Sequence, residues 1–410
     1  MASTINTNVN SLNAQRNLGM SAGSLATSMQ RLSSGLRVNS AKDDAAGLAI
    51  AERFLTQSKG LTVGARNSND GISLAQTAEG ALGKVGDMLQ RMRELAVQSG
   101  NATNSKSDRA SLQAEVKQLT DEIDRVAKQT GFNNQKILDG SFAGAVFQVG
   151  ANAGDNITVG ALTNSTAKGL ADVSYAFSQA ASDVNATAVS TLTAITEPTT
   201  LSISITGGSN VTLGEIKAAS SGEERMGQIV EAINRKSADT GVTAFLSKND
   251  SGTYRIDLMS SKLDSAGDAT VITTVGFTVA TTGLLGAALA SNINATNTTT
   301  DALGIDTLTV DTQRNAWVAL KKIDAAIDQV NSARANLGAL QSRFESAVGN
   351  IEISVENIAA SRGRIVDADF AKETANLSRT QILQQAGTAM VAQANPVSYT
   401  HLTLPTNREV

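Results

Sequence analysis

A long apolar seam runs through the C-terminal third of the chain. Between residues 316 and 358, apolar side chains recur at steps of three or four, and no proline interrupts them. These steps place the side chains on one face of an α-helix. The seam consists of Ala316, Leu320, Ile323, Ile327, Val330, Ala333, Leu337, Leu340, Phe344, Val348, Ile351, Val355 and Ile358. At about 1.5 Å per residue, the helix is on the order of 65 Å long. The pattern therefore predicts a core spine that other helices must cover.

A weaker helical pattern occupies the N-terminal arm, which Gly35 is expected to break. Its apolar positions are Leu18, Ala22, Leu25, Met29, Leu32 and Leu36, and small polar residues fill the rest. Burying the five large side chains contributes on the order of 10 kcal/mol, whereas fixing the backbone of residues 18–36 costs roughly 20–35 kcal/mol. We therefore expect this segment to be largely disordered alone and helical when another surface covers it.

The next stretch predicts two further helical regions separated by a turn. Ser40 and Asp43 have the spacing of a capping box, which predicts a helix start. The cluster at 67–71, Asn-Ser-Asn-Asp-Gly, predicts a turn, after which the heptad pattern resumes at 78–96 and stops at Gly100.

A third helix is predicted to begin near Ser105, because Asp108 follows three residues later. It carries apolar residues at helical spacing and ends at Thr130 and Gly131, where glycine suits the left-handed residue that often closes a helix. Together with the spine, these helices predict a bundle.

The period changes from 3.6 to 2 after residue 134. Alternation at 146–150 and 157–159 around the turn at 152–156 predicts a β-hairpin. Residues 166–301 are rich in Ser, Thr, Ala and Gly and predict an α+β insert, with strands near 201–205, 242–246 and 254–258 and a helix at 223–236.

A C-terminal arm follows a predicted break at Gly363. Its helix carries Ala371, Ala375, Ile382, Ala386 and Ala389 on one face. The predicted fold class is mainly α with a β-rich insert. It combines a long antiparallel helical bundle built from N- and C-terminal segments, terminal coiled-coil arms and a small α+β outer domain.

The composition of the chain argues against most classes of catalytic and metal-binding site. The chain has no Cys, and its single histidine is His401, so thiol chemistry, a Ser-His nucleophile system and a zinc site of the H-E-x-x-H type are not expected. We expect no catalytic, cofactor or metal site. A net charge of −4 with mixed signs gives no footprint for nucleic acid. No apolar stretch approaches 18 residues, and the N-terminus has no Sec-type signal pattern, so we expect neither membrane insertion nor a cleaved leader.

The last fifteen residues differ from the rest. Residues 396–410 contain two of the three prolines and the only histidine. Pro396 is expected to stop the preceding helix. We interpret 396–410 as a foreign tail that interrupts the inner coiled coil.

Four motifs closely resemble those of bacterial flagellins. They are LSSGLRVNSAKDDAAG at 32–47, RNSNDGIS at 66–73, LQRMRELAVQS at 89–99 and RIVDADFA at 364–371. The likeness covers residues 1–165 and 302–395, and the insert resembles a small β-rich motif of flagellins and hook-associated proteins. The resemblance implies an N-terminal arm at 1–44, a core at 45–165 and 302–360, an outward insert at 166–301 and a C-terminal arm at 361–395.

The resemblance also implies function, place and partners. A flagellin is exported unfolded through the flagellar type III channel and polymerises with copies of itself into the extracellular filament used for swimming. Further implied partners are the export apparatus, an export chaperone, the filament cap and junction proteins, and a vertebrate Toll-like receptor. Arm packing is assigned to Leu18, Leu25, Met29, Leu32, Leu36, Ala371, Ala375, Ile382 and Ala386. The receptor-facing patch implied by the family consists of Gln90, Arg91, Glu94, Leu95 and Glu115.

The sequence leaves two alternatives open and argues against a third. A hook-filament junction protein shares the arms but would form a capped interface. A protease-like insert, known in some flagellins, would need an H-E-x-x-H motif, which is absent. An adhesin or glycan carrier is compatible with the Ser/Thr-rich insert.

Overall fold

The computed structural model describes residues 8–171, 173, 175–178, 184–196, 201–205, 207–248, 251–263, 269–282 and 304–394. The predicted foreign tail at 396–410 and the first seven residues of the N-terminal arm lie outside this set. The chain divides into two compact units. One comprises residues 1–69, 147–157 and 344–410, and the other comprises 70–146 and 158–343.

The fold is mainly helical with a small β-containing insert, as predicted. The helices are α1 (Val9–Ser34), α2 (Ala45–Ser99), α3 (Lys106–Gln129), α4 (Gly222–Arg235), α5 (Ser237–Thr240), α6 (Val279–Thr282), α7 (Gln313–Val366) and α8 (Phe370–Ala394), with a 3₁₀ turn η1 (Ala186–Ala188). The strands are β1 (Gly131–Phe132), β2 (Gln135–Lys136), β3 (Ala145–Gln148), β4 (Asn156–Val159), β5 (Ala176–Ser178), β6 (Ser202–Ile205), β7 (Val211–Thr212), β8 (Val242–Lys248), β9 (Tyr254–Ser260) and β10 (Ile272–Val275).

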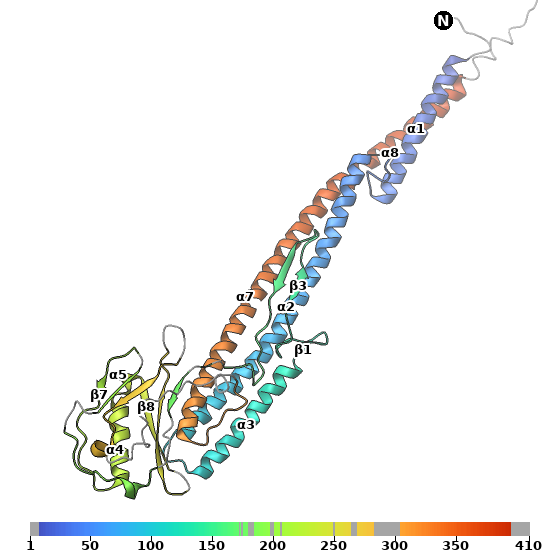
Figure 1. Cartoon of the computed structure of the whole chain (residues 1–410). Helices are drawn as coiled ribbons and strands as arrows, with labels where there is room; N and C mark the ends of the chain where they lie inside the picture. The colour runs from blue at the N-terminus through green and yellow to red at the C-terminus, as the bar shows by residue number, and fades with distance from the viewer. Residues whose placement is uncertain are drawn as a thin grey trace, which may run out of the picture. The chain divides into compact units, whose positions relative to one another are not determined.

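In the first unit, α1 and α8 lie side by side (Figure 1). The 45–69 part of α2 and the 344–366 part of α7 belong to the same unit. The tip of the β3–β4 hairpin approaches α2 closely, because a Cβ added at Gly64 would lie 2.3 Å from the carbonyl oxygen of Val149. Asn67 on the next turn donates to the carbonyl of Gln148 at 2.9 Å. The predicted hairpin is therefore present and packs on a glycine of the helix.

In the second unit, residues 70–99 of α2 pack with α3 and residues 313–343 of α7. Arg93 of α2 pairs with Asp324 of α7 at 2.6 Å. Leu82, Val85 and Leu89 are at most 1% exposed. Gln113 of α3 holds the segment before α7 by accepting from the amide of Val310 at 2.6 Å. These contacts confirm the predicted helical bundle.

The insert contains two three-stranded antiparallel sheets, ordered β5-β9-β8 and β10-β6-β7. The two seven-residue strands β8 and β9 pair from Val242 opposite Ser260 to Lys248 opposite Tyr254. Helix α4 packs on β8 (Figure 1). Its Ile229 and Ile233 enter a core with Leu201, Ile203 and Leu258, so the predicted α+β character of the insert is confirmed.

Two predicted breaks are wrong. At 67–71, α2 continues without a turn. The buried Ser68 hydroxyl donates to the carbonyl of Gly64 at 2.9 Å, and Asn69 donates to Ala65 at 3.0 Å. These turn-forming side chains bond back within the helix and are thus compatible with it. At Gly363, α7 also continues, and it ends three residues later at Val366.

Two predicted helix ends are partly correct. Helix α2 begins at Ala45, and its cap is Asp44, which accepts from the amide of Gly47 at 2.8 Å. Asp43 instead closes a preceding turn by accepting from Ser40. Helix α3 ends at Gln129 as expected, but Gly131 is not left-handed and begins β1. The capping box of Ser105 and Asp108 is confirmed.

Candidate functional site

The two arm helices meet along a seam of small and polar side chains. On α1 the covered positions follow each other at steps of three and four: Ser11, Ala14, Leu18, Ser21, Leu25, Ser28 and Leu32. The facing positions of α8 are Glu373, Leu377, Thr380, Gln384, Gly387 and Val391. Gly387 lies close to Leu18, because a Cβ added at Gly387 would be 3.2 Å from the Cδ1 atom of Leu18. This spacing is that of a coiled coil, but leucine occupies less than half of the seam.

Large apolar side chains lie outside this seam. The exposed ones on the arms are Val9, Leu12, Met20, Met29, Phe370, Ile382, Leu383 and Met390, with exposures of 51–68%. Among the described residues they account for eight of the fifteen exposed large hydrophobic side chains, although α1 and α8 have only 26 and 25 residues. Each arm therefore carries large apolar side chains that nothing in the described chain covers. They are spread around the helix rather than along one face, because Met20 and Met29 are nine residues, and thus about 180°, apart.

The predicted arm residues divide between the seam and the exposed sides of the arms. Leu18, Leu25 and Leu32 are half-buried in the seam, whereas Met29 is 57% exposed. Ala371, Ala375, Ile382 and Ala386 all lie exposed on α8. They lie on the side of α8 opposite the seam.

Leu36 lies beyond the end of α1, contrary to the predicted seam. Gly35 ends the helix in a left-handed conformation with φ of 71°. Leu36 then forms an antiparallel bridge with Asp367, and it packs on a small cluster of Val38, Ala51 and Val366. The arms are thus joined to α2 and α7 by two chain segments that pair with each other.

Arg37 holds this joint, a role that the sequence reasoning missed. Its guanidinium donates to the carbonyl oxygens of Ile365 at 2.6 Å and Arg364 at 3.2 Å. Its backbone amide donates to Val366 at 2.6 Å. These bonds satisfy carbonyls in the last turn of α7, where a cation is also favoured by the helix dipole. In the sequence, the position of Arg37 two residues after Gly35, the glycine that ends a helix, was the signal that could have indicated this role.

The predicted spine residues lie along α7. Ile323, Leu337, Leu340, Phe344 and Ile351 are buried, and Leu320, Ile327, Val348 and Val355 are half-buried. Phe344 stacks edge-to-face on Phe147 of β3 with ring centroids 5.4 Å apart. The spine therefore buries much of the seam that the sequence shows.

Four of the five residues of the predicted receptor patch lie at the surface of the second unit. Arg91 donates to Glu115 of α3 and Glu94 of α2, each at 2.8 Å. The hydrogen bond to Glu94 raises the pKa of Arg91 above its usual range, and the hydrogen bond to Glu115 adds to this effect. Gln90 is exposed, but Leu95 is only 1% exposed. Leu95 belongs to the bundle interior, because it lies on the same face of α2 as the buried Met92 and Ala96.

The described residues contain no cluster of three or more His, Cys, Asp or Glu side chains able to hold a metal ion. No helix in that part of the chain is both long and apolar enough to cross a membrane.

Comparison with known proteins identifies the family. Residues 5–143 match the bacterial flagellin N-terminal helical region and residues 320–404 the C-terminal helical region. Flagellin C of Vibrio cholerae serotype O1 is 37% identical over 98% of this chain and 100% of its own length. The chain belongs to the bacterial flagellin family. It is a structural subunit of the extracellular flagellar filament and not an enzyme, as the motifs predicted.

Other sequence matches agree with this flagellin assignment. Residues 200–262 match the flagellin hook IN motif, which confirms the resemblance stated for the insert. The B-type flagellin of Pseudomonas aeruginosa is 35% identical over 98% of this chain and 100% of its own length. The C-terminal match extends nine residues into the predicted foreign tail. Among solved structures, FliC from Burkholderia pseudomallei is 25% identical with a TM-score of 0.38, covering 67% of this chain and 99% of that one.

Proposed function

We propose that this flagellin polymerises through the exposed apolar side chains of α1 and α8. The observation that carries the proposal is the concentration of exposed large hydrophobic side chains on these two helices. Fully burying such a side chain contributes roughly 1.5–3 kcal/mol. Eight of them contribute on the order of 10 kcal/mol, which is comparable with the roughly 4–15 kcal/mol that association costs in lost freedom.

The polar seam supports a coupling between folding and assembly. Ser11, Ser28 and Thr380 occupy fully covered positions where a stable coiled coil would carry apolar residues. A pair of helices held by this seam alone is weak, and packing against the arms of other copies adds the missing apolar contacts. Arms that order only on assembly also suit export as an unfolded chain.

Seeded elongation tests this proposal. Ile382→Asn removes an apolar side chain from the exposed face of α8, whereas Leu263→Asn makes the same change at a 47% exposed leucine in the insert. Monomers of each variant are mixed with filament fragments, and light scattering and electron microscopy follow growth. We expect the Leu263 variant to elongate at the rate of the unmodified chain and the Ile382 variant to slow by at least about tenfold. Equal rates for the two variants would overturn the proposal.

We further propose the finer set of partners that the family resemblance implies. The unfolded arms would engage the export apparatus and an export chaperone, and the folded ends of the filament would meet the cap and junction proteins. The arms carry these contacts in the proposal, because they hold the apolar surface that a single chain leaves uncovered. Pull-down of the chaperone by isolated C-terminal arm peptides, compared with an Ile382→Asn peptide, tests the first of these contacts.

Recognition by a vertebrate Toll-like receptor is proposed for Gln90, Arg91, Glu94 and Glu115. Arg91 joins two helices through its two carboxylate partners, so the patch is fixed in position as well as exposed. Leu95 would act only from the interior. Receptor-reporter cells exposed to monomeric Arg91→Ala protein should respond less than to the monomeric Arg125→Ala control, which removes an exposed arginine from α3. An equal response would exclude the patch.

A further inference from the structure

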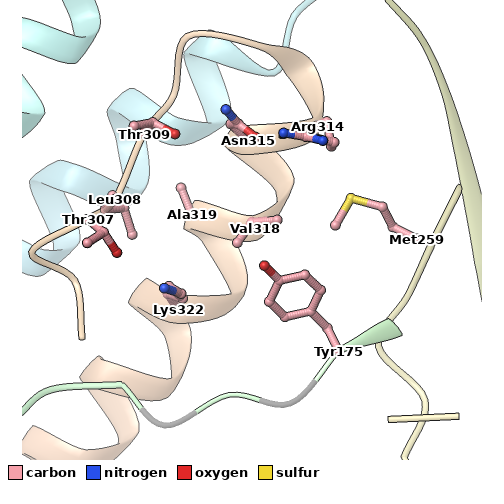
Figure 2. Close-up of a pocket in the computed structure, with 10 residues that line it drawn as sticks. All are labelled: Tyr175, Met259, Thr307, Leu308, Thr309, Arg314, Asn315, Val318, Ala319 and Lys322. Atoms are coloured by element: carbon pink, nitrogen blue, oxygen red, sulfur yellow. Dashed lines mark hydrogen bonds between the residues drawn. The ribbon is translucent and has the colours of Figure 1, made fainter. Parts of the chain in front are cut away.

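A small cavity of about 100 Å³ lies where the insert meets the start of α7. Its polar lining comprises Tyr175, Thr307, Thr309, Arg314, Asn315 and Lys322. Figure 2 shows Arg314, Asn315 and Lys322 on α7, with Tyr175 and Met259 across the cavity from them. All of these residues belong to the second unit.

The walls of this cavity are firmly held. Lys322 is 3% exposed and donates to the carbonyl of Gly304 at 3.2 Å. Gln113 of α3 donates to the carbonyl of Leu308 at 3.2 Å, and it accepts from the amide of Val310. These bonds fix the segment that carries Thr307 and Thr309. Polar groups fixed in this way bind a ligand without the entropic cost of ordering them.

The opposite wall is fixed as well. Tyr175 is 5% exposed and stacks edge-to-face on Trp317, with ring centroids 6.2 Å apart. Met259, on the central strand β9 of its sheet, is fully buried. The cavity is therefore bounded by α7, the segment at 304–310 and two residues of the insert.

The charge of the lining is positive. Among the residues that line the cavity, Arg314 and Lys322 are cations, and none is a carboxylate. Two carboxylates lie close to the lining and compensate part of its charge: Asp257 on β9 interacts electrostatically with Arg314, and Asp311 accepts from Asn315 at 2.7 Å. Arg314 and Asn315 also lie in the first turn of the 54-residue helix α7, where the helix dipole favours an anion.

The volume of the cavity limits the size of the ligand that it can hold. Pockets for organic cofactors and drug-sized molecules usually enclose about 300–1,000 Å³. A cavity of about 100 Å³ is too small for them and suits a few waters or a small anion. Guanidinium, ammonium and hydroxyl donors together are the usual partners of tetrahedral oxyanions.

We propose that this cavity is a binding site for a small tetrahedral oxyanion, with inorganic phosphate as its representative ligand. The anion would accept from Lys322 and Arg314 on α7, from the hydroxyls of Thr307 and Thr309, and from Tyr175 on the insert side. It would thereby tie the insert to the start of α7. This inference does not depend on polymerisation, since every residue involved belongs to one unit of one chain.

Thermal unfolding of the full-length monomer tests the site. Phosphate is titrated against chloride at matched ionic strength and constant pH. Unfolding around the cavity is followed by the fluorescence of Trp317, which lies on α7 and stacks on Tyr175 of the insert. A ligand that binds only the folded state raises the unfolding midpoint with the logarithm of its concentration. We expect a saturable rise with phosphate that chloride does not reproduce, and isothermal titration should give a stoichiometry of one per chain.

Variants separate the site from general charge effects. Lys322→Met removes the ammonium, and Lys321→Met removes the neighbouring lysine, which lies over the Trp317 ring and does not line the cavity. We expect phosphate affinity to fall at least about tenfold in the Lys322 variant and to stay unchanged in the Lys321 variant. Because Lys322 also holds Gly304, Thr307→Val serves as a second variant, for which we expect a smaller loss of affinity.

Three results would overturn the proposal. They are no saturable binding of phosphate, an equal response to chloride, and unchanged phosphate affinity in both the Lys322 and the Thr307 variants. Seeded elongation reports separately on the proposed function and should be the same with and without phosphate.

Discussion

The guanidinium of Arg37 donates a hydrogen bond to the carbonyl oxygen of Ile365 at 2.6 Å. This bond joins two residues 328 positions apart in the chain. The bond lies where the two arm segments leave the long helices α2 and α7. It therefore connects the N-terminal arm to the C-terminal arm within a single chain.

Removing this guanidinium should loosen both arms together. Arg37→Met loses charged hydrogen bonds to two carbonyls at an exposed position, so we expect about 1 kcal/mol less protection of the arms. In assembled filaments, hydrogen exchange should quicken in α1 and α8 and stay unchanged in α3. Arg16→Met, at an exposed site within α1, is the control. Unchanged exchange in α8 would show that Arg37 does not couple the arms.

Gly64 should resist substitution although it lies in a helix. An alanine Cβ there would lie 2.3 Å from the carbonyl oxygen of Val149, so the hairpin must shift. At Gly80 in the same helix, nothing lies within 4 Å of the added Cβ. We expect Gly80→Ala to stabilise the chain by roughly 0.5–1 kcal/mol and Gly64→Ala to destabilise it by roughly 1–3 kcal/mol. Urea unfolding of both variants checks the signs, and stabilisation by Gly64→Ala would contradict the close approach.

Arg225 is expected to be the residue on which the insert depends most. It is fully buried and donates to the carbonyls of Thr193 and Lys217, and burial lowers its pKa. Arg225→Met leaves these carbonyls without their donor, which costs roughly 2–4 kcal/mol. Limited proteolysis should then cleave the insert faster. Arg235→Met, at a half-exposed side chain of the same helix, should have almost no effect.

Two carboxylates should give opposite pH dependences. Hydrogen bonds from the hydroxyl and the amide of Ser105 lower the pKa of Asp108, so its contribution is present above about pH 4 and is lost on acidification. Burial raises the pKa of Asp257, which Arg255 partly opposes. Its ionised form therefore destabilises the folded insert at neutral pH, and this penalty disappears as pH falls through the raised pKa.

The measurement compares the unfolding midpoint from pH 3 to pH 7. Asp108→Asn should flatten the acidic part of the profile, and Asp257→Asn should flatten the part above about pH 4. A profile that neither substitution changes would contradict both assignments.

Sequence pattern was sufficient wherever one helix face is apolar. The spine of α7 and the capping box at Ser105 follow directly from spacing. The sequence pattern gave a wrong prediction, a turn, at Ser68 and Asn69. Whether such a side chain bonds back into the helix or forms a turn depends on packing.

The arms show a second limit of the sequence pattern. Helix α8 has two faces with helical spacing, one of small and polar residues and one with Ile382 and Ala386. A single chain can cover only one face, and the sequence gives no order of preference between α1 and other copies. The position of Leu95 shows the same limit, since a shared motif does not say which of its residues point inward.

Footprinting by hydroxyl radicals tests the central claim most directly. Met20, Met29 and Met390 are 57–62% exposed on the arms of one chain, and Leu263 is 47% exposed in the insert. If the arms assemble through their exposed apolar side chains, the three methionines are oxidised in monomers and protected at least about tenfold in filaments, while Leu263 is labelled equally in both. Equal oxidation of the three methionines in monomers and filaments would contradict assembly through these side chains.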